Sequence, residues 1–310
     1  MERLSTANTY HSALLNILSA QSRQTTAQSQ VATGKVADSL KGFNTHADTL
    51  TATRSLAARI DGYIDGAKTL SATLDVQDQA LGQLADVTQQ ARAAVADALA
   101  AGSAEGLMSA LGGYLGRTVD TLNTEYQGRR LFAGGKTDTA PLASLDMTAL
   151  AAAPSVPALF ANDQMAISRR LDDSLTLKTN FFADDLGAPT LQAMQAVAQL
   201  DAGPLGPLAG TLTQAQQTAL QGILQQFDDA WGGLNEAVAE NGGIQSRVAS
   251  IQNSLDDRRA TLEGVMGDIT NVDMAEAISR LEMARTALDA SAQVFGTLQA
   301  SSLLNVLGMR

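Results

Sequence analysis

Apolar residues recur at seven-residue intervals over long stretches of both halves of the chain. In the first half, one series runs over residues 60–95 and a second, offset series over residues 63–98. Seven-residue spacing places both series on one face of an α-helix, which is typical of coiled-coil packing. Thr45 and Asp48 offer a capping pair before this segment, and Gly102 follows its end. We therefore expect a single helix of about 80 Å, at about 1.5 Å per residue.

The same spacing predicts further helices. One is expected over residues 107–126, where leucines recur at helical spacing after Gly102. In the second half of the chain, apolar positions recur over residues 220–262. Glycine is unfavourable inside helices, so we expect interruptions at Gly242, Gly243 and Gly267.

The most regular pattern lies near the C-terminus. Thr270 and Asp273 can cap a last helix, which carries apolar side chains at strict seven-residue spacing. These side chains are Met274, Leu281, Leu288 and Phe295. Such a stripe is more often buried within its own chain than between subunits. The N-terminal segment is polar past Leu18, however, so one chain offers little to bury the stripe against. We therefore favour a seam between subunits.

The N-terminal segment itself is a weak helix former. After Leu18, its expected core positions are Gln21, Gln24 and Gln28. An isolated helix of this kind is marginal in water, so we expect it to be disordered until another surface covers it. The predicted assembly interface consists of Leu14, Ile17, Leu18, Met274, Ile278, Leu281, Leu288, Phe295, Leu298, Leu303, Leu304 and Leu307.

The middle of the chain differs from both ends. Residues 136–212 hold all six prolines. Short alternating stretches occur at residues 165–169 and 174–180, with Asp172 and Asp173 between them as a turn. This pattern predicts a small β-containing insertion. Helical segments on either side of an insertion must pair with each other to bury their apolar faces.

These patterns predict a mainly α fold, an elongated rod of long coiled-coil-like helices from both chain ends with a small β-containing insertion domain. We expect three parts: terminal segments 1–44 with 269–310, a helical rod 45–135 with 213–268, and the insertion 136–212.

Composition narrows the possible functions. The net charge of −11 argues against a nucleic-acid partner, since phosphate binding needs clustered lysines and arginines. Cysteine is absent, which excludes disulfides, cysteine-based zinc sites and a cysteine nucleophile. The two histidines, His11 and His46, lack metal-ligand spacing. Residues 1–20 are too broken for a signal-peptide core, and no run approaches the roughly 20 apolar residues of a membrane span. We expect no membrane insertion and no cofactor.

One segment resembles the end of a phosphate-binding loop. Gly134, Gly135, Lys136 and Thr137 match its last part, but Arg130 stands where the first glycine is required. The loop also follows a predicted helix instead of a strand. A turn is the better interpretation. Paired aspartates, such as those at positions 184–185 and 228–229, are interpreted as solvated charge, so we expect no enzyme.

Several motifs carry a resemblance to a known family. Residues 243–247 read GIQSR, residues 269–279 read ITNVDMAEAIS and residues 303–307 read LLNVL. Together with residues 32–56, ATGKVADSLKGFNTHADTLTATRSL, they resemble the conserved ends of the bacterial flagellin family. Residues 127–141, QGRRLFAGGKTDTAP, are similar to the hook–filament junction members of that family more than to flagellin itself. Lys41-Gly42-Phe43 departs from the pattern, since flagellins usually carry consecutive acids there.

The resemblance implies a layout and a location. The terminal helices would pair in an inner tube, the long helices would form the rod, and the insertion would face outward. The subunit would join hook to filament by polymerising through its terminal helices. Its partners would be other copies, flagellin, further flagellar axial proteins and an export chaperone. It would leave the cell through the flagellar secretion channel without a cleaved signal peptide, and become extracellular.

Two alternatives stay open. The nearest is flagellin itself, which forms the filament. The other is a cytoplasmic helical signalling hairpin, which has similar heptads, although a proline-rich insertion sits where a tight hairpin tip would be.

Overall fold

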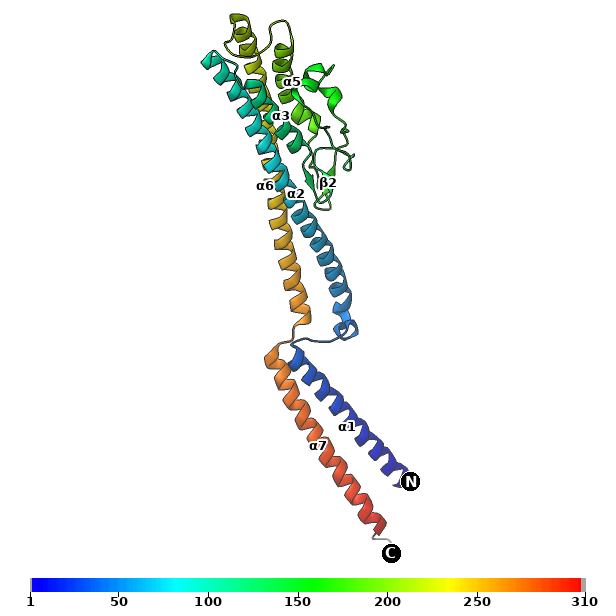
Figure 1. Cartoon of the computed structure of the whole chain (residues 1–310). Helices are drawn as coiled ribbons and strands as arrows, with labels where there is room; N and C mark the ends of the chain where they lie inside the picture. Colours follow the sequence, from blue (N-terminus) through cyan, green and yellow to red (C-terminus); the bar gives the residue numbers. More distant parts are fainter. Residues whose placement is uncertain (1, 308–310) are drawn as a thin grey trace. The chain divides into compact units, whose positions relative to one another are not determined.

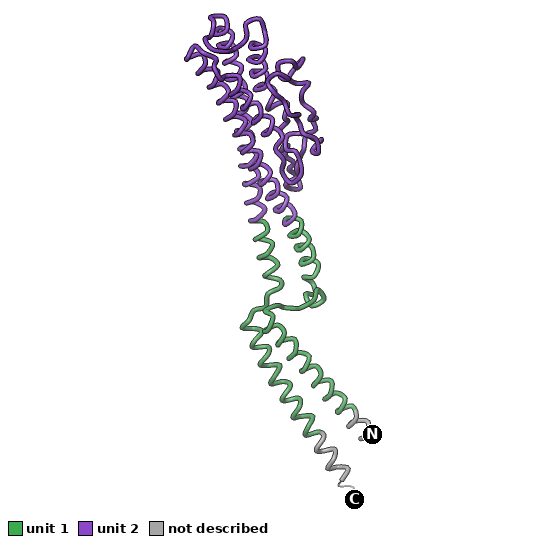
Figure 2. The backbone as a smooth tube through the Cα atoms, viewed as in Figure 1, with its two compact units in different colours: residues 1–60, 257–310 green, residues 61–256 purple. Residues whose placement is uncertain are grey.

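The computed structural model describes the backbone of residues 2–307 and the side chains of residues 8–298. Most of these residues are helical, and short strands form two small antiparallel sheets. The chain divides into two compact units, one of Met1–Ile60 with Asp257–Arg310 and one of Asp61–Asp256 (Figure 2). The predicted mainly α class, with long helices and a small β-containing region, is confirmed.

In the first unit, α1 (Glu2–Thr33) and α7 (Met274–Leu307) lie side by side and run antiparallel (Figure 1). The segments beside them are tied by backbone hydrogen bonds: the N–H of Val36 donates to the carbonyl of Thr270 over 2.8 Å, and that of Val272 to the carbonyl of Gly34 over 2.9 Å. The start of α7 and the end of α1 are therefore fixed to each other.

The N-terminus of α7 is capped by Asp273. Its Oδ1 accepts hydrogen bonds from the N–H groups of Ala275 (2.8 Å) and Glu276 (3.1 Å). These N–H groups lack partners inside the helix, so the cap satisfies them. Thr270, the other expected capping residue, is instead the last residue of α6 (Gln214–Thr270).

The predicted long helix is α2 (Ala47–Ala101). Its C-terminal stop is as expected, because Gly102 has a φ of 63° and ends the helix. Its start differs from the prediction, since Thr45 lies inside the 3₁₀ helix η1 (Leu40–His46), which leads directly into α2. The first predicted stripe is buried throughout: Ile60, Ala67, Leu74, Leu81, Thr88 and Val95.

The expected breaks in the second long helix are wrong. Helix α6 runs through Gly242, Gly243 and Gly267 without interruption. Each interior glycine costs about 1 kcal/mol relative to alanine, and contacts with α2 offset this cost. The fully buried Asn241 donates to the carbonyl of Leu74 over 3.1 Å, beside the two glycines. Tertiary packing therefore overrides the local preference.

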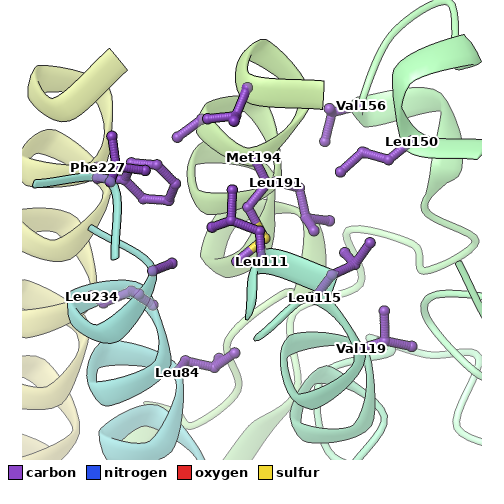
Figure 3. Close-up of a cluster of buried hydrophobic side chains, with 14 of the residues drawn as sticks. Leu84, Leu111, Leu115, Val119, Leu150, Val156, Leu191, Met194, Phe227 and Leu234 are labelled. Carbon is purple, nitrogen blue, oxygen red and sulfur yellow. The ribbon is translucent and has the colours of Figure 1, made fainter. Parts of the chain in front are cut away.

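The second unit has its core where α2 and α6 meet α3 (Leu107–Leu122) and α5 (Ala183–Ala202). Figure 3 shows the labelled side chains of Leu111, Leu115, Leu191 and Phe227 pointing into this cluster. The predicted helix after Gly102 is α3, but it ends four residues before Tyr126, which lies in β1.

The insertion contains both helices and strands. Just before it, strands β1 (Glu125–Tyr126) and β2 (Arg129–Arg130) form a hairpin, and within it β3 (Ser168–Arg170) pairs with β4 (Thr176–Lys178). The second pair confirms the predicted alternating strands and their turn. The short helices α4 (Met147–Ala152) and η2 (Pro157–Leu159) and the longer α5 were not predicted.

Candidate assembly surface

The α1–α7 pair has a seam in which alanines alternate with larger residues. On α1, half-buried or buried positions alternate at spacings of three and four, as in a coiled coil. They are Tyr10, Ala13, Ile17, Ala20, Gln24 and Ala27. On α7 the matching positions are Ala277, Leu281, Ala284, Leu288, Ser291, Phe295 and Leu298. Alanine allows close helix approach but buries little apolar area.

Three of the four residues in the predicted stripe on α7 turn toward α1, while Met274 is exposed. Leu281 is only 9% exposed, and Leu288 and Phe295 are half-buried. The ring of Phe295 meets that of Tyr10 edge to face, with centroids 5.5 Å apart. These residues thus have an intramolecular partner. The alanines of α1 provide a surface for them, which the polar pattern past Leu18 did not indicate.

Other predicted interface residues are well exposed. Leu14 and Leu18 are 46% and 52% exposed on α1, and Met274 and Ile278 are 44% and 45% exposed on α7. At 100° per residue, Leu14 and Leu18 point well away from Ala20. Helix α1 therefore carries two apolar faces, one paired within the subunit and one facing solvent, and α7 carries exposed apolar side chains beside its paired face.

The remaining predicted residues fall into two groups. Ile17 and Leu298 are half-buried along the seam. Leu303, Leu304 and Leu307 lie in the last turns of α7, where their side chains are outside the described residues. Of the twelve predicted interface residues, four are well exposed. The others whose side chains are described lie in or beside the seam.

Sequence analysis missed three exposed apolar side chains on the same pair. Leu15 extends the Leu14–Leu18 surface of α1, and Met283 and Val294 lie on α7. Full burial of a leucine or methionine side chain is worth about 1.5–3 kcal/mol. Packing against another helix would bury such side chains and stabilise the pair. In the sequence, these three side chains could be recognised only as apolar residues that fall outside the heptad positions.

A groove runs along one flank of the α1–α7 pair. It has a volume of about 480 Å³ and is lined by Ala27 on α1 and by Met283 and Ala287 on α7. Arg23 and Arg280 stand at its edges, and Arg280 is paired with a glutamate one turn earlier on α7. A groove lined by apolar, polar and charged residues suits an amphipathic helix.

The loop that resembles a phosphate site holds an internal carboxylate. The N–H of Gly135 donates to Oδ1 of Asp163 over 2.6 Å, and the N–H of Met165 donates to the same oxygen over 3.1 Å. These two hydrogen bonds lower the pKa of Asp163. The ammonium of Lys136 donates to the carbonyl of Ala161. The groups that would hold a phosphate therefore bind the chain itself.

The setting of this loop also differs from the prediction. The β1–β2 hairpin stands between α3 and the loop, so the loop follows a short strand. No helix begins at the loop, because the next helix is α4 at Met147. Gly134 has a φ of +67°, and a side chain there would collide with Asp163. The two glycines therefore allow a tight turn.

Members of the paired aspartates form contacts with other side chains of the same chain. Asp228 forms an ion pair with Arg92 that joins α6 to α2. Asp184 accepts hydrogen bonds from the amides of Asn162 and Gln164, while burial, with the Asp184 charge adding to it, raises the pKa of Asp185. Within the described residues, no cluster of metal-binding side chains occurs. In that same part of the chain, none of the helices combines the length and apolar character that crossing a membrane requires.

Comparison with known proteins gives matches at two levels. Residues 224–307 match the family described as the bacterial flagellin C-terminal helical region. No curated protein matches the sequence significantly. Among solved structures, a Vibrio parahaemolyticus protein described as a flagellar hook-associated protein is 18% identical, with a TM-score of 0.59 over 72% of this chain and 97% of its own.

Two further solved structures agree. Bacillus cereus FlgL is 15% identical, with a TM-score of 0.56 over 70% of this chain and 99% of its own. The flagellar hook associated protein-3 of Legionella pneumophila is 11% identical, with a TM-score of 0.56 over 71% of this chain and 98% of its own. The resemblance found in the sequence is confirmed: the chain carries a flagellin C-terminal helical region and shares the fold of flagellar hook-associated proteins.

Proposed function

We propose that this chain is a structural subunit of the bacterial flagellum, and that it joins the hook to the filament by polymerising through α1 and α7. The flagellin C-terminal region and the fold support a structural role in the flagellum. The junction role rests on the segment 127–141 and on the names of the solved structures of this fold.

One observation carries the mechanism. The α1–α7 pair buries alanines and some larger residues between its helices, but leaves other large apolar side chains, including Leu18 and Met283, facing solvent. Burial of these side chains requires a surface outside the subunit. Contacts between copies that do not close a ring produce helical tubes, so the exposed apolar side chains of one copy, packed against another copy, can extend an assembly.

The proposed partners follow from this mechanism. They are other copies, flagellin and further axial proteins, together with an export chaperone that covers the exposed face before assembly. Export through the flagellar channel, without a cleaved signal peptide, would bring the subunit outside the cell. Catalysis, nucleic-acid binding and membrane insertion form no part of the proposal.

The proposed parts are the terminal helices 1–44 with 269–310, the rod 45–135 with 213–268 and the outward insertion 136–212. We propose that the terminal helices are disordered in the free monomer, because their seam is rich in alanine and buries little area. Limited proteolysis of the purified monomer should trim to about residue 45 and about residue 268. Full resistance of both ends would contradict this part.

A deletion strain tests the junction role. Without this protein, cells should make hooks but no filaments, and should shed flagellin into the medium. Wild-type protein supplied from a plasmid should restore filaments. The alternative, flagellin itself, predicts hooks with no filament and no shed flagellin, because the filament protein would be missing.

A further inference from the structure

A groove in the second unit gathers positive charge in a chain whose net charge is −11. One face of α2 forms its floor, and the β1–β2 hairpin and strand β3 with the residues that follow β4 form its walls. Its volume of about 460 Å³ falls in the range of small-molecule sites. Four arginines line the groove, and no aspartate or glutamate is among its lining residues: Arg129, Arg130, Arg169 and Arg170.

Two of these arginines are held in place by neighbouring groups. Arg130 donates to the carbonyl of Asn123, and its guanidinium lies 3.5 Å from the carboxylate of Glu125. Arg170 donates to two backbone carbonyls of the β3–β4 turn and lies near one carboxylate of that turn. Both guanidiniums are therefore oriented and partly neutralised.

The other two arginines have no such partner. Arg129 and Arg169 are exposed, and within the described residues neither side chain forms an ion pair or hydrogen bond. Arg169 stands opposite Leu177 in the β3–β4 register, so the two share a face of the sheet. Leu177 packs with Leu70 and Leu74 of α2. The side chain of Arg169 therefore projects from the face of the sheet that is turned toward α2.

The floor holds a polar group that also lacks a partner. Gln77 lines the groove and is 2% exposed, and its Oε1 has no hydrogen-bond partner among the described residues. Buried side-chain amides are normally hydrogen-bonded, and the oxygen and nitrogen of an amide can exchange places by rotation. Gln77 can therefore offer either a donor or an acceptor to a molecule in the groove.

We propose that this groove binds a small molecule carrying two or more oxyanion groups, either carboxylates or phosphates. Arg129 and Arg169 stand on different walls and bind separate anionic groups, because a guanidinium matches such groups with two parallel hydrogen bonds. Gln77 contacts the ligand from the floor. The site is independent of polymerisation, since its residues lie outside the α1–α7 pair.

Isothermal titration calorimetry on the full-length monomer tests this proposal, with pyrophosphate and citrate as separate probes at low salt. We expect saturable binding of at least one probe at a single site. The double variant Arg129→Gln/Arg169→Gln should weaken that binding about tenfold or more, because charge-assisted hydrogen bonds are lost. Arg247→Gln removes the same charge from an exposed position on α6 of the same unit, and should leave binding unchanged.

The outcomes separate the ligand classes. Preference for citrate indicates a carboxylate ligand, and preference for pyrophosphate indicates a phosphate ligand. Gln77→Leu should weaken binding several-fold, and unchanged melting temperatures would show that the variants are folded. The proposal is overturned if neither probe binds saturably, or if Arg247→Gln weakens binding as much as the double variant does.

Discussion

Leu18→Asp tests the exposed apolar face of α1 without changing the face that packs against α7. Leu18 is 52% exposed and lies off the seam with α7, so a carboxylate there stays hydrated in the free subunit. We expect the free energy of unfolding to change by less than about 1 kcal/mol, as for most surface substitutions.

In the assembly the same substitution should be severe. Burying the exposed half of a leucine is worth about 1 kcal/mol, and burying an unpaired carboxylate costs several kcal/mol more. A total of about 3 kcal/mol or more lowers the affinity of one subunit for the growing end by about 100-fold or more. The variant should therefore be made and stay folded, but fail to restore filaments in the deletion strain.

Leu281→Asp is the companion variant. Leu281 is 9% exposed and packs within the α1–α7 seam, so the same carboxylate should prevent α1 and α7 from pairing when the terminal helices order on assembly. Circular dichroism and urea titration check that the rod of both free variants stays folded, and filament counts measure assembly. The account is refuted if Leu18→Asp assembles normally, or if either substitution unfolds the rod of the free subunit.

Three further predictions concern the second unit. Phe227 is fully buried, so Phe227→Ala should lower the free energy of unfolding by about 3–5 kcal/mol in urea titrations, and a loss below about 1 kcal/mol would contradict the core assignment. Hydrogen bonds from the N–H groups of Gly135 and Met165 lower the pKa of Asp163 in the folded state, so this carboxylate stabilises the fold above the unfolded pKa of about 3.9. That stabilisation is lost as the pH falls through the folded pKa; the melting-temperature gap between wild type and Asp163→Asn should therefore shrink from about pH 5 to about pH 2, and a constant gap would count against the assignment. Lys136→Ala should leave melting temperature and motility nearly unchanged, whereas ATP binding by the wild type that the variant loses would contradict the non-enzymatic proposal.

The long helices could be predicted because heptad spacing is a local signal. The buried stripe from Ile60 to Val95 follows it position by position. The faces of α1 could not be assigned in the same way. Its seam uses Ala13, Ala20 and Ala27, while the larger Leu14 and Leu18 face solvent. Ranking residues by hydrophobicity selects the leucines, whereas the close approach of two helices selects the alanines.

Features that depend on distant residues were not predictable. Asp163 accepts a hydrogen bond from Gly135 in the glycine loop, although it lies 28 positions further along the chain, and no local motif marks it. The two arginine pairs come together only when β2 and β3 meet α2. Helix α5 was missed because Gly187 and Pro189 indicate a break, yet its apolar face packs into the core of the second unit.

Immunogold labelling of intact flagella tests the central claim most directly. An antibody against the insertion, residues 136–212, should label each flagellum at the boundary between hook and filament and nowhere else. Label along the whole filament would identify the chain as flagellin. Flagella without any label, in cells that produce the protein, would contradict its role as a structural subunit of the flagellum.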